Sequence, residues 1–127
     1  MRFRSRYRLA TAVNREISWS SCAKDLITRG EKVYAANCAA CHQANGKGVP
    51  NAFPALDGSK IVTGPKAAHM DVVMNGVLKD GKPTAMVGWK STLADTDLAA
   101  VVTYERNSWG NHAGDAIQPA EILAAKK

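Results

Sequence analysis

The sequence lacks long hydrophobic runs, a second pair of cysteines and alternating polar and apolar segments. No apolar stretch approaches the roughly 18 residues that a membrane-spanning helix needs, which excludes a transmembrane segment in this chain. Three cysteines in 127 residues exclude a four-cysteine zinc site. No segment alternates as a half-buried strand does. The chain has room for a single core, so these absences leave a small helical domain.

The formal net charge of +6 is concentrated near the N-terminus. Residues 1–23 hold five arginines and one glutamate, residues 24–110 hold ten basic and eight acidic side chains, and residues 111–127 are balanced. A basic arm can contact nucleic acid, but no nucleic-acid-binding fold accompanies it, so we expect no nucleic-acid partner. We therefore divide the chain into a basic, disordered segment (1–23), a folded domain (24–110) and a C-terminal tail (111–127).

Two of the three cysteines stand in the pentapeptide Cys38-Ala39-Ala40-Cys41-His42. This C-x-x-C-H spacing is typical of covalent c-type haem attachment. Each thiol can form a thioether with a haem vinyl group, and the following histidine can bind the iron as the proximal ligand. The alternatives are a thioredoxin-like motif, which needs a βαβ context, and half of a zinc site, which needs a second thiol pair. We predict one covalently bound haem c, and an aromatic content of only 6% suits an interior filled by a porphyrin.

The third cysteine, Cys22, is interpreted as an exposed or disordered thiol rather than part of a disulfide or a lipid anchor. Haem c is normally attached outside the bacterial inner membrane, so we expect a periplasmic location or the outer face of that membrane. Residues 1–8 resemble the charged start of an export signal. Residues 9–16 are too short and too charged for its hydrophobic part, so no clear signal peptide is present. Either export depends on something not encoded here, or the chain is a piece of a longer one.

Three segments have helical periodicity. Apolar residues at three- and four-residue intervals predict a helix over residues 24–40, which ends in the haem motif. A second helix is predicted over residues 65–75, with proline in its first turn and Asn-Gly as a stop signal. A third is predicted over residues 95–107, with two aspartates at the positive end of the helix dipole. Residues 79–86 are expected to form a polar loop, so the predicted fold is all-α, with three main helices around one haem.

These features resemble class I cytochrome c over residues 24–110. In that family the first helix carries a glycine and an aromatic residue four positions apart, and the aromatic precedes the first haem cysteine by four. Gly30, Tyr34 and Cys38 match this spacing. The resemblance implies that Gly30 lets the last helix cross closely, and that Tyr104 is the aromatic packed at the crossing.

The resemblance also implies which residues hold the iron. A proline carbonyl about a dozen residues after the ligand histidine, here that of Pro54, accepts the histidine Nδ1 proton and fixes its tautomer. The second axial ligand is a methionine in the loop before the last helix, and Met86 occupies that place. Met70 and Met74 lie four residues apart in the predicted second helix, where methionine ordinarily packs in the core or the haem wall.

Other residues have less specific expectations. His69 and His112 are expected at the surface. Trp89 is expected to pack against the haem or in the core. Trp109 is either an exposed contact or a cap on the core. Three lysines could steer an acidic partner toward the haem edge or could simply be solvated, namely Lys47, Lys60 and Lys82.

The resemblance can be narrowed further. Residues 29–37, 53–59, 64–69 and 100–111 are similar to the cytochrome c domain at the C-terminus of subunit II of bacterial haem-copper oxidases. That domain passes electrons from a soluble cytochrome or a cytochrome bc1-type complex to the dinuclear copper of the same subunit. The present chain has no paired transmembrane helices and no copper-binding loop. It is the haem domain alone, a truncated product or a free-standing relative.

The predicted function is one-electron transfer by a His/Met-ligated haem c that feeds or belongs to a respiratory haem-copper oxidase. The chain is not expected to be an enzyme by itself, because an iron with both axial positions filled has no vacancy for a substrate. One alternative is a haem enzyme or gas sensor with an open sixth iron position, in which Met86 would be absent or labile. The other is a structural domain in which haem only stabilises the fold.

Overall fold

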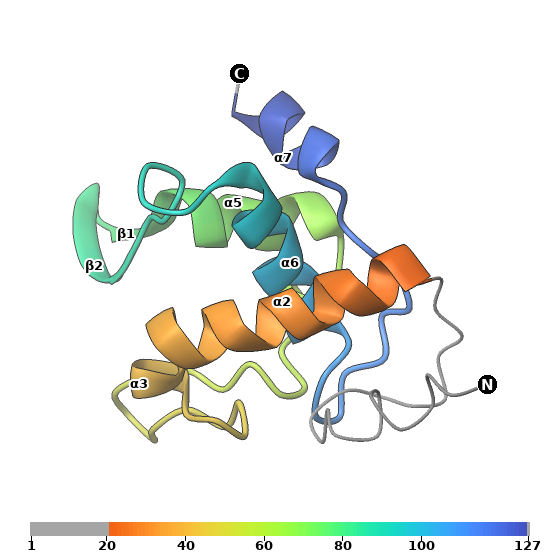
Figure 1. The fold of residues 1–127 in the computed structure, drawn as a ribbon. Helices are drawn as coiled ribbons and strands as arrows, with labels where there is room; N and C mark the ends of the chain where they lie inside the picture. Colours follow the sequence, from red (N-terminus) through yellow and green to blue (C-terminus); the bar gives the residue numbers. More distant parts are fainter. Residues whose placement is uncertain (1–20, 127) are drawn as a thin grey trace.

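The computed structural model describes residues 21–126. The predictions for residues 1–20 and for the Cys22 side chain lie outside the described part of the chain. Figure 1 shows the helices and the small hairpin in the described range. In chain order these are α2 (Ser21–Asn37), α3 (Ala39–His42), α4 (Lys60–Thr63), α5 (Lys66–Asn75), β1 (Gly76–Lys79), β2 (Lys82–Val87), α6 (Asp95–Arg106) and α7 (Pro119–Ala125).

Helices dominate the described residues, which confirms the predicted fold class, and the three predicted helices are α2, α5 and α6. The first helix begins at Ser21 and ends at Asn37, somewhat earlier at both ends than predicted. It ends there because the chain turns at Cys38, where φ is −115° and ψ is −31°. The remaining haem-motif residues then form the short helix α3. None of the helices among residues 21–126 combines the length and the apolar character that crossing a membrane requires.

Residues 79–86 do not form the loop that the sequence predicted. They contribute to an antiparallel hairpin, β1–β2, whose two strands are only four and six residues long. Asp80 and Gly81 close it with φ of 55° and 77°, which is the conformation that Asp-Gly favours in tight hairpin turns. Strands this short are difficult to detect from alternation, and the turn sets their pairing. The paired residues are Gly76 with Val87, Leu78 with Pro83 and Lys79 with Lys82.

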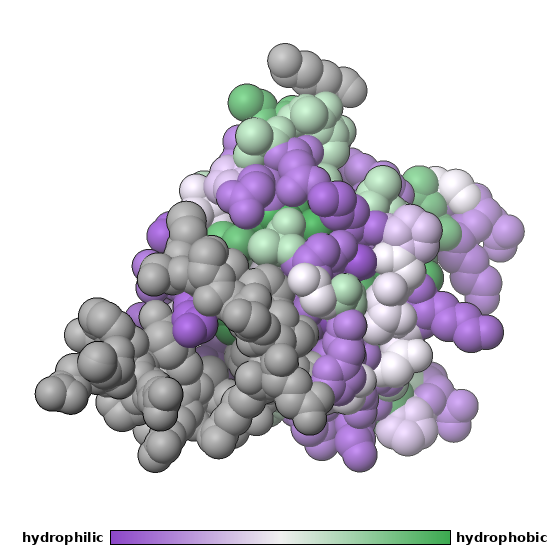
Figure 2. Space-filling view, turned by 90° about the vertical axis from the view of Figure 1, so that its right-hand side faces the viewer, coloured by the Kyte–Doolittle hydropathy of each residue, from purple (hydrophilic) through white to green (hydrophobic). Residues whose placement is uncertain are grey.

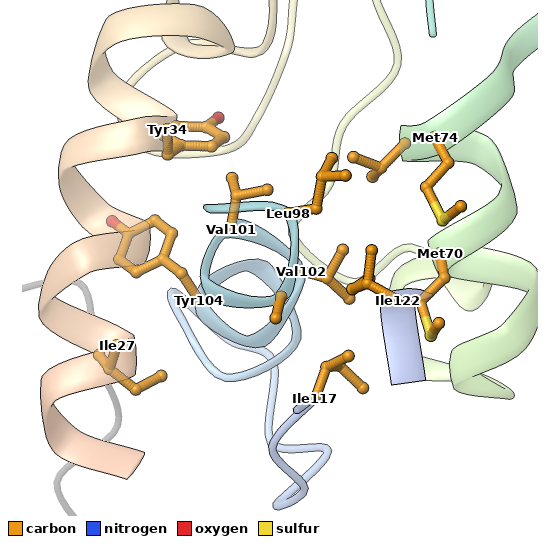
Figure 3. Close-up of a cluster of buried hydrophobic side chains, with 12 residues drawn as sticks. Ile27, Tyr34, Met70, Met74, Leu98, Val101, Val102, Tyr104, Ile117 and Ile122 are labelled. Carbon is orange, nitrogen blue, oxygen red and sulfur yellow. The ribbon is translucent and has the colours of Figure 1, made fainter. Parts of the chain in front are cut away.

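The helices α2 and α6 cross closely at Gly30, as predicted. A Cβ atom on Gly30 would overlap the carbonyl oxygen of Ala100 and lie 2.7 Å from Cβ of Tyr104. The rings of Tyr34 and Tyr104 pack at this crossing with their centroids 5.5 Å apart. Figure 3 shows both rings between the two helices. Only glycine permits this approach, because any side chain would push the two backbones apart.

The central helix of the core is α6, in which every residue from Leu98 to Arg106 is buried. Figure 3 shows α6 between α2 on one side and α5 on the other. Met70 and Met74 of α5 belong to this core, which confirms the packing alternative for them. Ile117 and Ile122 are fully buried as well. Residues 111–126 are therefore more than an appended tail, since α7 packs against α5 and α6.

We predict that Gly30→Ala destabilises the haem-loaded protein by about 1–3 kcal/mol, because overpacking at the crossing outweighs the gain in helix propensity. Denaturant unfolding followed by circular dichroism measures the change. The matched control is Ala35→Gly, which is exposed on the same helix and should cost no more than about 1 kcal/mol. A Gly30→Ala variant more stable than the parent would show that propensity governs this position and the crossing does not.

Candidate haem site

A mainly apolar cavity of about 360 Å³ is bordered by the α2–α3 turn, the segment around residues 52–62, α5 and the hairpin. In Figure 1, α3 and the hairpin lie on the same side of the molecule. The cavity lining includes every residue that the sequence predicted to hold haem: Cys38, Cys41, His42, Pro54 and Met86. The fold thus brings together side chains from three separate regions of the sequence.

His42 ends α3 and is only 8% exposed. Its Nδ1 lies 2.9 Å from the carbonyl oxygen of Pro54, as the sequence predicted. A carbonyl oxygen can only accept, so Nδ1 carries the hydrogen and Nε2 keeps a free lone pair. This is the tautomer that an iron ligand needs.

Gly48 places the Pro54 carbonyl. Its backbone N–H donates to the His42 carbonyl oxygen over 2.9 Å, and its φ is +65°. A Cβ atom there would overlap the Phe53 carbonyl oxygen and lie 2.6 Å from that of Pro54. A residue with a side chain would therefore displace the acceptor that orients the His42 ring.

Cys38 and Cys41 are free thiols of the polypeptide and are partly buried at the cavity wall. Burial, followed by the charges of Glu105 and Cys41, raises the pKa of the Cys38 thiol to about 12. A redox-active Cys-x-x-Cys pair needs the opposite, a thiolate at neutral pH, so the thioredoxin-like alternative is disfavoured. No group of three metal-ligating His, Cys, Asp or Glu side chains occurs among residues 21–126, which disfavours the zinc alternative in that range.

Met86 lies on β2 and lines the cavity, whereas Met70 and Met74 pack in the core outside it. The hairpin fixes its backbone through Thr84. The Thr84 hydroxyl donates to the Val77 carbonyl oxygen over 2.7 Å and accepts from the Met86 backbone N–H over 3.2 Å. Of these three methionines, Met86 is thus the one whose thioether shares a cavity with the His42 imidazole.

His69 does not lie at the surface, so that prediction was wrong. It is 2% exposed, and its Nε2 lies 2.7 Å from Oε1 of Glu105 on α6. Both side chains line the cavity. The sequence contained one signal of this pair: Glu105 falls within a helix segment whose neighbours are predominantly apolar. His112 is exposed, as predicted.

Trp89 and Trp109 differ in position. Trp109 caps the core, because its ring centroid lies 5.3 Å from that of Tyr34 and 5.7 Å from that of Tyr104. Its indole N–H donates to the Ala44 carbonyl oxygen over 3.0 Å, which ties the loop after the haem motif to the end of α6. Trp89 is partly buried and lines the cavity.

A buried polar network behind the cavity escaped the sequence analysis. The Arg106 guanidinium donates to the carbonyl oxygens of Val62 and Gly64 and pairs with both carboxylate oxygens of Asp115. The Asn111 amide donates to the carbonyl oxygens of Leu56 and Glu105. These bonds hold the chain on either side of the cavity against the end of α6. The carbonyl oxygens of Val62, Gly64 and Leu56 lie more than 40 residues away in sequence, so no local pattern indicates these bonds.

Comparison with known proteins agrees with this geometry. Residues 25–104 match the sequence model of a family described as "Cytochrome C oxidase, cbb3-type, subunit III". The chain belongs to the cytochrome c family. Members of this family are electron-transfer modules rather than enzymes in themselves, and they carry covalently attached haem c, so the cofactor of this cytochrome c domain is haem c.

Individual relatives fall into two groups. The cytochrome c subunit of a quinone-dependent alcohol dehydrogenase from Gluconobacter oxydans is 36% identical over 99 residues, which cover 73% of this chain and 21% of the relative. The gluconate 2-dehydrogenase cytochrome c subunit of Pantoea cypripedii is 31% identical over 107 residues, or 77% of this chain and 24% of the relative. Cytochrome c-552 of Thermus thermophilus is 34% identical over 91 residues, or 65% of this chain and 69% of the relative. The chain thus spans about a fifth of the dehydrogenase subunits.

The cavity fits haem in the chemistry of its lining. Its lining is largely apolar, as a porphyrin requires, and its donor set consists of two thiols, an imidazole with a free Nε2 and a thioether. Without the cofactor, the apolar side chains that line the cavity would be exposed to water. A bound haem covers them, so we expect the cofactor to stabilise the fold.

We therefore predict that Cys38→Ala/Cys41→Ala, which removes both attachment points, abolishes covalent haem and most of the helical circular dichroism signal. Cys22→Ala is the matched control, since it keeps the C-x-x-C-H motif and should retain both. Haem staining of a denaturing gel and far-ultraviolet spectra measure the two effects. A fully helical haem-free double variant would show that the polypeptide folds without its cofactor.

Proposed function

We propose that this cytochrome c domain is a one-electron carrier in which Cys38 and Cys41 attach the haem and His42 and Met86 are the axial iron ligands. The supporting observation is that a single apolar cavity is lined by all four side chains, from α2–α3 and from β2. The hydrogen bond from His42 Nδ1 to the Pro54 carbonyl leaves the lone pair of Nε2 available to bind iron.

When bound, the haem supplies an iron that alternates between Fe(III) and Fe(II). The residues of the chain determine how easily it does so. The Met86 thioether is a soft ligand that favours Fe(II) and raises the reduction potential. The hydrogen bond from His42 to Pro54 holds the imidazole in one orientation, and the apolar walls exclude water. The helices are packed tightly enough that little rearrangement accompanies the gain of one electron.

The proposed electron-transfer surface is an apolar rim at the cavity. Four large hydrophobic residues in and near the hairpin are unusually exposed, among them Leu78 at 62% and Val87 at 52%. The others are Ile61 and Val77. Exposed lysines occur in the same segments, namely Lys60, Lys79 and Lys82. An apolar centre with basic neighbours suits a partner that presents an acidic ring around an apolar contact.

Figure 2 shows the side of the molecule that is on the right in Figure 1, away from the hairpin. Its described residues are mostly hydrophilic, and hydrophobic ones gather near the top, where α7 lies. The exposed hydrophobic residue of α7 is Leu123. We therefore assign partner contact to the rim at the cavity, where the exposed apolar residues adjoin the proposed haem site.

We further propose that the electron acceptor is a respiratory haem-copper oxidase and the donor a soluble cytochrome or a cytochrome bc1-type complex, on the outer side of the membrane. The description of the matched family supports this choice, as does the resemblance of several residue runs to oxidase subunit II that the sequence analysis noted. The competing partner is a quinone-dependent dehydrogenase, because several relatives are cytochrome subunits of dehydrogenases.

The ligand assignment is tested by absorption spectra of haem-loaded protein and of Met86→Ala. We expect the oxidised parent to show the weak long-wavelength band of Met-ligated iron and to resist carbon monoxide, and the variant to lose the band and bind the gas. Met74→Leu, a volume-conserving change in the core, is the control and should keep the band. A parent that binds carbon monoxide readily would favour the gas sensor or haem enzyme instead.

The partner assignment is tested by Lys60→Glu/Lys82→Glu. Oxidation of the reduced protein by oxidase-containing membranes should slow by about tenfold at low salt, and the difference should shrink as salt screens the charges. The control is Lys32→Glu, exposed on α2 and not part of the cavity lining. If the double variant instead slows reduction by a quinone-dependent dehydrogenase and leaves oxidation by the oxidase unchanged, the dehydrogenase is the partner.

A further inference from the structure

The buried pair of His69 and Glu105 has no role in the function proposed so far. Their side chains are 2% and 5% exposed, and one hydrogen bond of 2.7 Å joins Nε2 to Oε1. The second ring nitrogen, Nδ1 of His69, is also buried and has no hydrogen-bond partner within residues 21–126. Two ionisable groups at the back of an apolar cavity are costly, so their presence calls for a reason.

The pair has two charge states that differ by one proton. With the proton bound, either the imidazolium faces the carboxylate or both groups are neutral, and the net charge is zero. Without it, the neutral imidazole donates its Nε2 hydrogen to the carboxylate and one negative charge stays buried. A buried uncompensated charge is expensive unless a positive charge lies nearby. The charge of the bound cofactor therefore bears directly on which state is populated.

The pair is close enough to the cofactor to respond to it. Both residues line the cavity with Cys38 and His42. Burial is the largest cause of the raised pKa of the Cys38 thiol, and the negative charge of Glu105 is the next largest. The field of Glu105 therefore reaches the proposed attachment point of the haem. For Tyr34 on α2 as well, burial is the largest cause of the raised pKa and the charge of Glu105 is the next largest. At the low effective dielectric of such a site, these interactions are weakly screened.

Other charged groups near the pair have partners of their own. Arg106 follows Glu105 but pairs with Asp115 and donates to backbone carbonyls. Lys66, on the same helix as His69, pairs with Glu121 on α7. From α2 and α6 the pair is faced by neutral groups, the thiol of Cys38 and the phenols of Tyr34 and Tyr104. A haem bound in this cavity would bring the positive charge of its iron to the site that the pair lines.

We propose that His69 and Glu105 form a proton-binding site coupled to the haem, so that this domain takes up a proton when it accepts an electron. This inference rests on the proposed function, since it needs a haem that changes oxidation state in the cavity. Reduction adds one electron from the redox partner and removes one positive charge at the iron. The pair then binds one proton from solvent to become neutral, and reoxidation releases that proton.

Thermodynamic reciprocity gives the measurable consequence. If reduction tightens proton binding about tenfold or more, the midpoint potential must fall with rising pH over the range in which the pair titrates. The slope can reach about 59 mV per pH unit, because one pH unit is a tenfold change in proton concentration and a tenfold change corresponds to about 59 mV for a one-electron couple. Outside that range the potential is flat.

The experiment is a potentiometric titration of the haem-loaded protein from about pH 5 to 9. The parent is compared with Glu105→Gln, which keeps a hydrogen-bonding side chain of the same size but no negative charge. We expect a sloping segment in the parent and its loss in the variant. His112→Gln, at an exposed histidine, is the control and should keep the slope.

A second measurement on the parent alone guards against a variant that does not fold. Chemical reduction in weakly buffered solution with a pH indicator dye should show uptake of a fraction of one proton per electron, largest where the potential slopes most. A flat potential with no proton uptake overturns the proposal, as does a slope that survives in Glu105→Gln, which assigns it to another group. In either case the spectra of the parent and of Met86→Ala still decide the axial ligands, so the two proposals fail separately.

Discussion

The close crossing of α2 and α6 at Gly30 determines where the C-x-x-C-H residues, Cys38, Cys41 and His42, lie. Because the two backbones are in contact there, the position of α2 along α6 is fixed. The position of the turn at Cys38, where α2 ends, is therefore fixed relative to α6 as well. The aromatic cluster of Tyr34, Tyr104 and Trp109 then fills the angle between the helices. From that corner, α3 directs His42 into the cavity. A shift of either helix would move the thiols and the imidazole together.

The parts of the site predictable from sequence are those that depend on local spacing. The haem motif, the glycine and aromatic that precede it and the three main helices all follow from intervals of three or four residues. The hydrogen bond from His42 to Pro54 was expected only from the resemblance to a family, because nothing local in residues 43–53 fixes the path of that loop. Here family likeness supplied what periodicity could not.

What the sequence could not reveal depends on tertiary contacts. The hairpin was missed because its short strands pair through a two-residue turn rather than through alternation. His69 was assigned to the surface because the partner that keeps it inside, Glu105, lies far along the chain on another helix. The packing of α7 against α5 and α6 depends on two isoleucines, too few to show a periodic pattern. In each case a distant contact overrides the local signal.

The position of Met86 on the hairpin has a consequence for how the molecule comes apart. The two strands have exposed apolar side chains and form a sheet of only two strands, whereas His42 is anchored to the main helices. A unit with so few buried contacts opens at a smaller free energy than the whole domain does. The two residues proposed as axial ligands therefore belong to parts of the fold with different local stabilities. Under that proposal, loss of the sulfur ligand would report the opening of one hairpin, and loss of the imidazole would report the unfolding of the main helices.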